Sequence, residues 1–530
     1  MSARRVRLFR STYVDSVIQL SGTRAMRAVD GVEWAAAAMA IPANLDTLAE
    51  QGFNPQDWAG GGANDLVIAV HASSEVVAER AEQAGQAAIF DSSGSGSSGS
   101  GSSGGRDPGD GSRAERPPRT LREAMARVPG SNVAVISVPG DYAALEAHQA
   151  LSAGLDVLLF SDNVSLAAEV ELKQRAKRLS RLVMGPGAGT AMLGGTCLGF
   201  ANVTAPGPVA VVAAAGTGAQ EAMSLLDRWG VGVSHVIGLG GRDLSAEVGG
   251  TMADSALRLL ADDERTQVVL LVSKPPSPEV ARAVLPAAGA KPVIAALLGV
   301  PSSMDVPGGV TLATTLETGV VATLTAVGRR APDPAAGLRE QVAGAMAALP
   351  ERRRLVRGLF SGGTLCYESL VILSAHLPEY LGPVYSNTPL DPDLGLPAPS
   401  GSHLCLDLGE EEYTQGRPHP MIDPEARIEL LREQGTDPDV AAIILDVVLG
   451  YGAHDNPAGE LAPVCAEITA GGGPLVVVYV LGTEGDPQGF DVQRQAFTDA
   501  GCVVTETAAR ASLAAAAIAS RDPELARARL

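Results

Sequence analysis

Two Gly-Thr pairs are the part of this sequence best suited to hold an anion. Gly216-Thr217 and Gly363-Thr364 each follow an apolar run and open a helical pattern, and a glutamate stands four residues after each threonine. The first N–H groups of a helix lack acceptors within the helix, and glycine lets an anion come close to them. Two such ends facing each other would hold one phosphate, although threonine at a helix start is also an ordinary N-cap. The predicted phosphate-binding residues are Gly216, Thr217, Gly218, Gly362, Gly363 and Thr364.

A glycine-rich segment, residues 185–199, is a second candidate site, because its backbone N–H groups could line an anionic ligand. The alternative is a surface loop without a ligand. Cys197 lies in this segment, and a single cysteine beside apolar and small residues is more typical of packing than of a nucleophile. The predicted ligand-contacting residues are Gly185, Gly187, Gly189, Thr190, Gly194, Gly195 and Thr196.

Four side chains that follow strand patterns are candidates for catalysis. Lys274 comes after the apolar run VVLLVS and could neutralise charge on a phosphate or carbonyl oxygen. The loops after HLCLDLG and AAIILDVV carry an arginine and two histidines. Arginine clamps carboxylates through two hydrogen bonds, and histidine exchanges protons near neutral pH. The alternatives are a surface lysine and loops held by their own ion pairs. The predicted catalytic residues are Lys274, Arg417, His419 and His454.

Parallel strands are needed to position these residues, and the chain from Thr120 onward has the required pattern. Short apolar runs alternate with helical patterns, which predicts parallel sheets covered by helices, with ligands at the carboxyl ends of the strands. Residues 1–90 predict a small N-terminal α/β domain, and the Gly/Ser-rich residues 91–118 a flexible linker. The further expected domains cover residues 119–206, 207–330 and 331–530.

The composition favours layered α/β domains and argues against a nucleic-acid- or membrane-binding protein. Hydrophobic residues make up 46% of the 530 residues but aromatic ones only 4%, so the cores must consist of small aliphatic side chains. The formal net charge of −20 repels nucleic acid and anionic lipid. Two basic runs, residues 173–181 and 352–357, are interpreted as solvated helix faces.

Cysteine spacing and hydropathy exclude further classes. The five cysteines include no CxxC pair and no zinc-type spacing, so neither disulfides nor a metal site is expected. The first residues lack the apolar core of a signal peptide, and no uncharged apolar stretch reaches the roughly 18 residues of a membrane span. We therefore expect a cytoplasmic protein without bound metal.

Several segments resemble the succinyl-CoA synthetase family. Residues 181–190 (RLVMGPGAGT), 213–230 and 236–244 (VIGLGGRDL) resemble its α subunit, and residues 358–369 and 404–420 resemble the C-terminal domain of its β subunit. The resemblance implies a CoA-binding Rossmann-like unit followed by two flavodoxin-like, doubly wound parallel-sheet units. It also makes CoA a candidate cofactor.

This chain departs from that family at the phosphorylated histidine. The family carries the histidine in a loop after the strand that corresponds to KPVIAALLG, but no histidine lies between His235 and His376 here. Lys274 stands where the family places a glutamate beside the histidine, and too few residues precede Thr120 for an ATP-grasp-like domain. We therefore expect no relay of phosphate from ATP through a phosphohistidine.

A branch with these departures is the FdrA family. The segments MSARRVRLFRSTYVDSVIQL, VSKPP, RGLFSGGTLCYE and DLGEEEYTQGRPHPMIDP all resemble FdrA. The resemblance implies an acyl-CoA synthetase-like subunit of an oxamate carbamoyltransferase, which works with companion subunits and converts carbamoyl phosphate and oxamate into oxalurate and phosphate. That reaction needs a phosphate site and a stabilised oxyanion but no phosphohistidine.

Two other functions stay open at this point. The chain could be a CoA-dependent acyltransferase or acyl-CoA synthetase, or a scaffold subunit without catalytic residues of its own. In each case the expected partners are small-molecule substrates, companion subunits and further copies of the chain.

Overall fold

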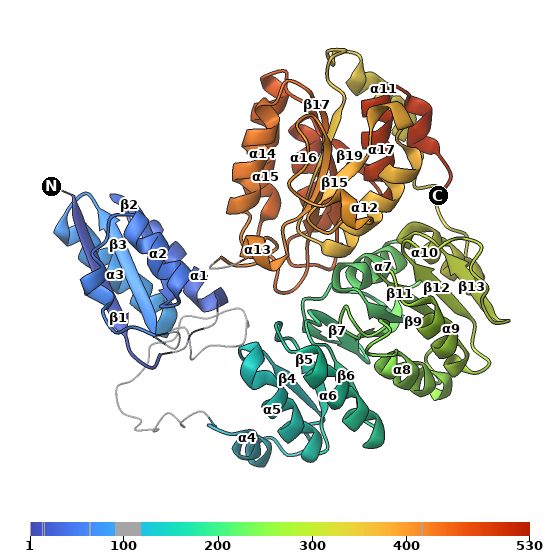
Figure 1. Cartoon of the computed structure of the whole chain (residues 1–530), viewed down its shortest axis with the longest axis horizontal. Coiled ribbons are helices and arrows are strands. Elements are labelled where there is room, and N and C mark those ends of the chain that lie inside the picture. The colour runs from blue at the N-terminus through green and yellow to red at the C-terminus, as the bar shows by residue number, and fades with distance from the viewer. Residues whose placement is uncertain (1, 13, 15, 63–64, 91–117, 415–416) are drawn as a thin grey trace, which may run out of the picture. The chain divides into compact units, whose positions relative to one another are not determined.

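The computed structural model describes residues 2–12, 14, 16–62, 65–90, 118–414 and 417–530. They form two units, whose elements are labelled in Figure 1. The N-terminal unit comprises residues up to Pro117 together with Glu410–Ile422, and the main body comprises Pro118–Gly409 and Asp423–Leu530. Apart from Pro118, the predicted Gly/Ser linker lies outside the described residues.

The N-terminal unit contains a three-stranded antiparallel sheet in the order β1-β3-β2. β3 is buried along nearly its whole length because it lies between both partners and is covered on both faces. Met26 and Ile89 cover one face, and Leu48 and Trp58 cover the other. The elements are β1 (Ala3–Phe9), α1 (Ser16–Arg27), β2 (Val32–Met39), α2 (Pro42–Glu50), β3 (Leu66–Ala72), α3 (Glu75–Phe90) and α13 (Glu411–Thr414).

The main body begins with a small domain, called here the CoA-like domain, whose parallel sheet has the order β4-β5-β6. Its core of alanine, leucine and valine continues into the core of the domain that follows. The elements are α4 (Leu121–Arg127), β4 (Val133–Ile136), α5 (Gly140–Ser152), β5 (Asp156–Leu159), α6 (Leu166–Arg178) and β6 (Val183–Met184).

The first ligase-like domain has a seven-stranded sheet in the order β13-β12-β11-β9-β10-β7-β8. The five strands from β13 to β10 are parallel, and β9 and β11 are buried because helices cover both faces. The hairpin β7–β8 lies before the predicted boundary at residue 206 but pairs with β10. The elements are β7 (Thr190–Leu193), β8 (Thr196–Gly199), β9 (Pro206–Ala214), α7 (Gly216–Arg228), β10 (Val233–Gly238), α8 (Thr251–Asp262), β11 (Val268–Ser273), α9 (Pro278–Val284), β12 (Val293–Leu297), β13 (Val310–Ala313) and α10 (Leu316–Ala326).

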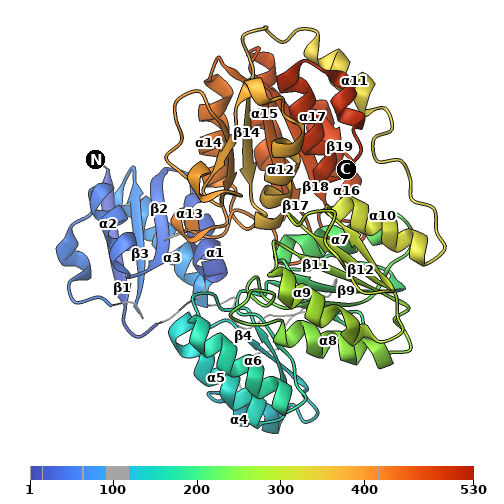
Figure 2. The same ribbon diagram turned by 45° about the vertical axis from the view of Figure 1, so that its right-hand side comes forward.

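The second ligase-like domain has a six-stranded parallel sheet in the order β15-β16-β14-β17-β18-β19. Figure 2 shows this sheet with helices on both faces. The elements are α11 (Leu338–Met346), β14 (Leu355–Phe360), α12 (Gly363–His376), β15 (Val384–Ser386), β16 (His403–Asp407), α14 (Glu425–Thr436), β17 (Val440–Val448), α15 (Pro457–Ala470), β18 (Leu475–Leu481), α16 (Phe490–Asp499), β19 (Val503–Thr505) and α17 (Ala508–Ser520).

The two ligase-like domains repeat one topology. In each, the first strand, β9 or β14, lies inside the sheet between the second and third principal strands, which is the flavodoxin-like order. The helix after the first strand is α7 in one domain and α12 in the other, and the last helices are α10 and α17. The predicted fold class is therefore confirmed, from the small N-terminal α/β domain to the two flavodoxin-like units.

The interpretation of the two basic runs as solvated helix faces is wrong for three of their members. Lys173 is fully buried and donates to Glu169 and Asp243, each at 2.8 Å. Arg353 and Arg357 are also buried and donate to backbone carbonyls, including that of Val440. Buried charges need partners, and two of these partners, Asp243 and Val440, lie 70 and 87 residues away, too far along the chain to be visible in the local pattern. Within the described part of the chain, no helix is long and apolar enough to cross a membrane.

Candidate functional site

The two predicted helix ends meet in the main body. α7 begins at Gly216 directly after β9, and α12 begins at Gly363 after β14. Figures 1 and 2 both place these helices where the two ligase-like domains adjoin. The backbone N–H of Thr364 donates to the hydroxyl of Thr217 at 3.3 Å. A Cβ atom at Gly362 would lie 2.8 Å from the Thr217 methyl carbon, so the close approach of the two ends requires glycine there.

The end of α7 is open to an anion. Its N-cap residue, Ala215, offers no side-chain hydrogen bond, and the N–H groups of residues 216–218 have no acceptor among the described residues. A Cβ atom at Gly216 would meet nothing within 4 Å. Unsatisfied N–H groups at a helix N-terminus attract negative charge, both through hydrogen bonds and through the helix dipole.

The end of α12 is already partly occupied by carboxylates. Asp446, buried in β17, accepts from the N–H groups of Ser361 and Gly362, each at 2.7 Å. Arg427 balances its charge, with 3.1 Å between Nη2 and Oδ1. The N–H of Gly362, a predicted phosphate-binding residue, therefore already donates to a carboxylate within the chain. The sequence signal that could have found Asp446 is an acidic residue inside the apolar run AAIILDVV, since charges are rarely buried without a partner.

Lys274 and Asp407 lie together in front of α12. A Cβ atom at Gly363 would lie 3.0 Å from Lys274 Nζ and would overlap Asp407 Oδ2. Lys274 directly follows β11 of the first ligase-like domain, and Asp407 ends β16 of the second. Both therefore stand at carboxyl ends of parallel strands, where such sheets place ligands. Asp407 was not among the predicted residues, although its position at the end of HLCLDLG is the same signal that pointed to Lys274.

The charges at this point favour an anion at α7 rather than at α12. No hydrogen bond or ion pair holds Lys274 among the described residues, so its ammonium group is available to a ligand. The carboxylate of Asp407 repels an anion at the N-terminus of α12, whereas a Cβ atom added at Gly216 would have no carboxylate within 4 Å. The arrangement can bind a phosphate at α7, with the cation of Lys274 at the start of the adjoining α12.

The other predicted catalytic residues belong to other segments of the chain. Arg417 and His419 belong to the segment Glu410–Ile422 of the N-terminal unit, and His454 lies in the main body before α15. His419 Nδ1 accepts from the N–H of Met421 at 3.3 Å. His454 Nδ1 accepts from the N–H of Asn456 at 3.1 Å. Each histidine thus accepts a hydrogen bond within its own loop. A catalytic role for Arg417, His419 and His454 stays a prediction.

The glycine-rich segment forms the hairpin β7–β8 and the turn before it. Gly194 and Gly195 make the hairpin turn with φ of +60° and +88°, so this turn needs glycine for its conformation. A cleft of about 430 Å³ is lined by Met192, Gly195, Cys197, Gly199, Val203, Thr204 and Tyr451. Burial and the charge of Asp486 raise the pKa of the Cys197 thiol, which keeps it protonated and supports a packing role.

One helix of the CoA-like domain has an end suited to a phosphate of CoA, the cofactor that the resemblance implies. α5 begins at Gly140 after β4, and its N-cap residue, Pro139, provides no side-chain hydrogen bond. The start of α6, by contrast, is capped by the hydroxyl of Ser165, which accepts from Ala168 N–H. The backbone N–H groups at the start of α5 would hold a CoA phosphate, against the repulsion of the Asp141 carboxylate in the same turn and beside the carbonyl oxygens of Asp162 and Asn163.

Comparison with known proteins finds a relative along almost the whole chain. The protein YahF of Escherichia coli K12, described as uncharacterized, is 37% identical over 517 residues, which are 95% of this chain and 96% of YahF. A family model described as CoA-ligase matches residues 359–518, and one described as AllF, heavy metal-associated domain, matches residues 1–105.

Other similarities cover parts of the chain. The α subunit 2 of succinate–CoA ligase from Archaeoglobus fulgidus is 31% identical over 159 residues, which are 29% of this chain and 54% of that subunit. The match thus spans about half the length of the ligase subunit. An acetyl-coenzyme A synthetase from Ca. Korarchaeum cryptofilum overlaps 76% of this chain and 86% of its own, with a TM-score of 0.29 and 16% identity.

The residues of the N-terminal unit do not fit a heavy metal. Soft metals bind cysteine or methionine sulfur and imidazole, but the first cysteine of the sequence is Cys197. His71 of β3 lies 3.2 Å from Glu33, and no group of three or more His, Cys, Asp or Glu side chains is placed to hold a metal ion in the described parts of the chain. No step of the chemistry below passes through a metal.

Proposed function

We propose that this chain transfers acyl or carbamoyl groups to or from phosphate. The premise is that the chain belongs to the family of the Escherichia coli protein YahF and carries a CoA-ligase domain at residues 359–518. More specifically, we propose an FdrA-type subunit of an oxamate carbamoyltransferase. It would convert carbamoyl phosphate and oxamate into oxalurate and phosphate, together with companion subunits. The observation that carries the proposal is the open N-terminus of α7, which contacts the start of α12, where Lys274 lies.

The residues at this point suit the chemistry of that transfer. The N–H groups of residues 216–218 would bind the phosphate of carbamoyl phosphate, and Lys274 would balance its charge. The amide nitrogen of oxamate attacks the carbamoyl carbon, the bond from that carbon to the phosphate oxygen breaks, and the nitrogen loses a proton. Charge develops on the carbamoyl oxygen during this attack, and a lysine that nothing else holds can stabilise it. None of these steps needs the histidine that is missing between His235 and His376.

A second candidate is an acyl-CoA synthetase-like reaction. It is supported by the CoA-ligase domain and by the similarity to the succinate–CoA ligase subunit. In that case the start of α5 would hold CoA, and the paired helix ends would hold an acyl phosphate. Residues that replace the missing histidine would then have to come from another chain.

The two candidates are separated by their products. We expect the full chain, mixed with its companion subunits, carbamoyl phosphate and oxamate, to release phosphate and form oxalurate in equal amounts. We expect no acid-labile label on the chain from radioactive ATP and Mg²⁺, because the histidine is absent. Acyl-CoA formed from ATP, CoA and a carboxylic acid, without oxalurate, would contradict the carbamoyl transfer and support the second candidate.

Blocking the end of α7 should weaken phosphate binding. The substitution Gly216→Val adds a branched side chain at the first residue of α7, where an added Cβ atom meets no other atom within 4 Å. Each helix end contributes about 0.3–2 kcal/mol to anion binding, so the affinity for inorganic phosphate should fall about two- to thirtyfold in a calorimetric titration.

Gly344→Val is the matched control for this substitution. Gly344 lies in α11, and an added Cβ atom there also has nothing within 4 Å. The Gly344→Val protein should therefore bind phosphate with the affinity of the unsubstituted chain. Gly363→Val is less informative, because the new side chain would displace Asp407. Unchanged affinity in a folded Gly216→Val protein would mean that the Gly-Thr turns are only helix starts.

A further inference from the structure

Behind the paired helix ends, each ligase-like domain places a buried glutamate against the last helix of the other domain. Glu221 of α7 accepts from the N–H of Ala508, the first residue of α17, at 3.5 Å. Glu368 of α12 accepts from the N–H of Leu316, the first residue of α10, at 2.6 Å. The two glutamates hold the same place in the repeat, and their contacts are reciprocal.

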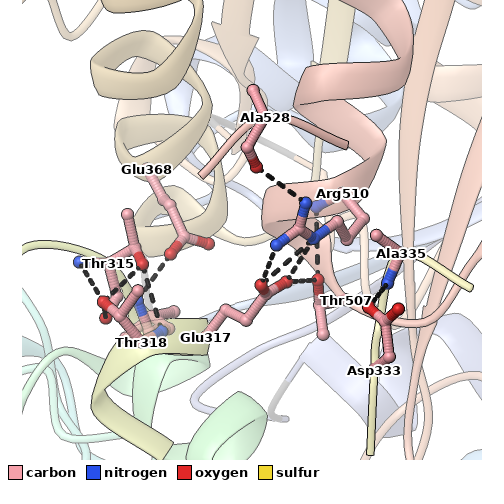
Figure 3. Close-up of polar contacts among 10 residues, drawn as sticks. Thr315, Glu317, Thr318, Asp333, Ala335, Glu368, Thr507, Arg510 and Ala528 are labelled. Carbon is pink, nitrogen blue, oxygen red and sulfur yellow. Dashed lines mark hydrogen bonds and ion pairs between the residues drawn. The ribbon is translucent and has the colours of Figure 1, made fainter. Parts of the chain in front are cut away.

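The last helices of the two domains are also joined to each other, as Figure 3 shows. Arg510 of α17 forms an ion pair with Glu317 of α10, and its Nε lies 3.1 Å from Oε1. The hydroxyl of Thr507 donates to the same carboxylate at 2.6 Å. Thr507 is the N-cap residue of α17 and belongs to this contact, whereas Thr315, the N-cap residue of α10, bonds with Thr318 of its own helix.

Burying this cluster of carboxyl groups costs free energy, so stabilisation alone does not account for it. Three carboxyl groups, those of Glu221, Glu317 and Glu368, are at most 3% exposed, and Arg510 pairs with Glu317. Oε2 of Glu368 has no hydrogen-bond partner in the described structure. Burial and the neighbouring carboxylates of Glu221 and Glu317 raise the pKa of Glu368, which favours the uncharged form of its carboxyl group.

The glutamates lie about one to two turns along each helix from the Gly-Thr ends. Glu221 follows Gly216 by five residues on α7, and Glu368 follows Gly363 by five residues on α12, which is about 7–8 Å along a helix axis. A shift of either last helix would therefore move the helix that carries the glutamate, and with it the N–H groups at its start. The hydrogen bond between Thr364 and Thr217 lies directly at those starts.

We propose that Glu221 and Glu368 are positioning residues, which fix the mutual placement of the two Gly-Thr helix ends by capping the last helix of the opposite domain. The part that concerns anion binding rests on the proposed function, whereas the reciprocal capping does not. The conservative substitution to glutamine keeps an acceptor oxygen and should preserve the cap, while alanine removes it.

Amide hydrogen exchange of the full chain tests the capping directly. Glu368→Ala should speed exchange in the first turn of α10, in the other domain, and leave that of α17 unchanged. Glu221→Ala should do the reverse. A hydrogen bond of this kind contributes about 0.5–1.5 kcal/mol, so exchange should rise about two- to tenfold. If Glu368→Ala does not fold, Glu368→Met, which keeps the volume of the side chain, replaces it.

Calorimetric titration with inorganic phosphate tests the positioning. We expect lower affinity in Glu368→Ala, affinity near that of the unsubstituted chain in Glu368→Gln, and no change in the control Glu460→Ala, whose side chain is exposed on α15. Unchanged exchange in α10 would overturn the capping. Raised exchange with unchanged phosphate affinity would overturn the positioning role and leave the proposed function standing. If Gly216→Val also leaves phosphate binding unchanged, the proposed function fails and the positioning role fails with it.

Discussion

Replacing Lys173 by methionine should lower the free energy of unfolding of the main body by about 3–5 kcal/mol, because it would leave the buried carboxylate of Asp243 without a cation and Glu169 with Arg242 alone. Lys173 of α6 is fully buried, and its Nζ donates to Glu169 and Asp243 at 2.8 Å each and to the carbonyl of Leu239 at 2.9 Å. Glu169 lies on the same helix, whereas the other two acceptors belong to the first ligase-like domain. The lysine therefore joins the CoA-like domain to that domain.

Urea unfolding of the full chain measures this effect, and Lys177→Met is its control. Lys177 lies on the same helix and pairs with Asp254 at 2.9 Å, but 54% of its side chain is exposed. An exposed pair contributes at most about 1 kcal/mol, so the control should stay close to the unsubstituted chain. Equal losses in the two variants would show that the buried cluster has no special role in joining the domains.

Lys173 also illustrates what the sequence patterns leave out. The alternation of apolar runs and helical patterns was enough for the fold class, because a parallel strand covered on both faces must be apolar throughout. A run of charged residues on a helix does not reveal whether one of them is buried, because a partner that allows the burial of Lys173, Asp243, lies 70 residues away. The run containing Lys173 was therefore interpreted as a solvated face.

The sequence patterns predicted those parts of the candidate site that depend on local pattern and topology. The Gly-Thr pairs mark helix starts after strands, and the carboxyl ends of parallel strands lie at one edge of a sheet, so local pattern and topology together pointed to Gly216 and Lys274. The carboxylate of Asp446 was missed because its partners, the amides of Ser361 and Gly362, are 85 and 84 residues away. The expected joint role of Arg417 and His419 depended on the course of a loop, which no periodic pattern describes.

The main body should lose stability as the pH rises from about 5 to about 8, and Glu221 should account for up to about 3 kcal/mol of that loss. Burial raises the pKa of Glu221 from 4.5 to about 7. The hydrogen bond from Tyr479 and the charge of Arg228 oppose this shift, while the nearby carboxylate of Glu317 adds to it. Glu368 interacts with Glu221 and has a raised pKa as well.

The direction of the effect follows from proton binding in the two states. Below pH 4.5 the carboxyl group of Glu221 is protonated in both the folded and the unfolded chain, so the stability it contributes is fully present. Between that pH and about 7 the unfolded chain releases the proton while the folded chain keeps it, which favours unfolding. The loss should amount to about 1.4 kcal/mol for each pH unit and end once the folded chain also releases the proton.

The variant Glu221→Gln isolates this contribution, because glutamine stays uncharged, its oxygen can accept from the N–H of Ala508 and its amide N–H can donate to the hydroxyl oxygen of Tyr479. Urea unfolding of both proteins at pH 5, 6, 7 and 8 should show similar stability at pH 5 and a more stable Glu221→Gln protein at pH 8. The histidines and exposed carboxylates titrate alike in both proteins, so they cancel in the difference. A difference that does not change with pH would mean that Glu221 is ionised in the folded chain, and that the contact between the two ligase-like domains carries a full negative charge at this position.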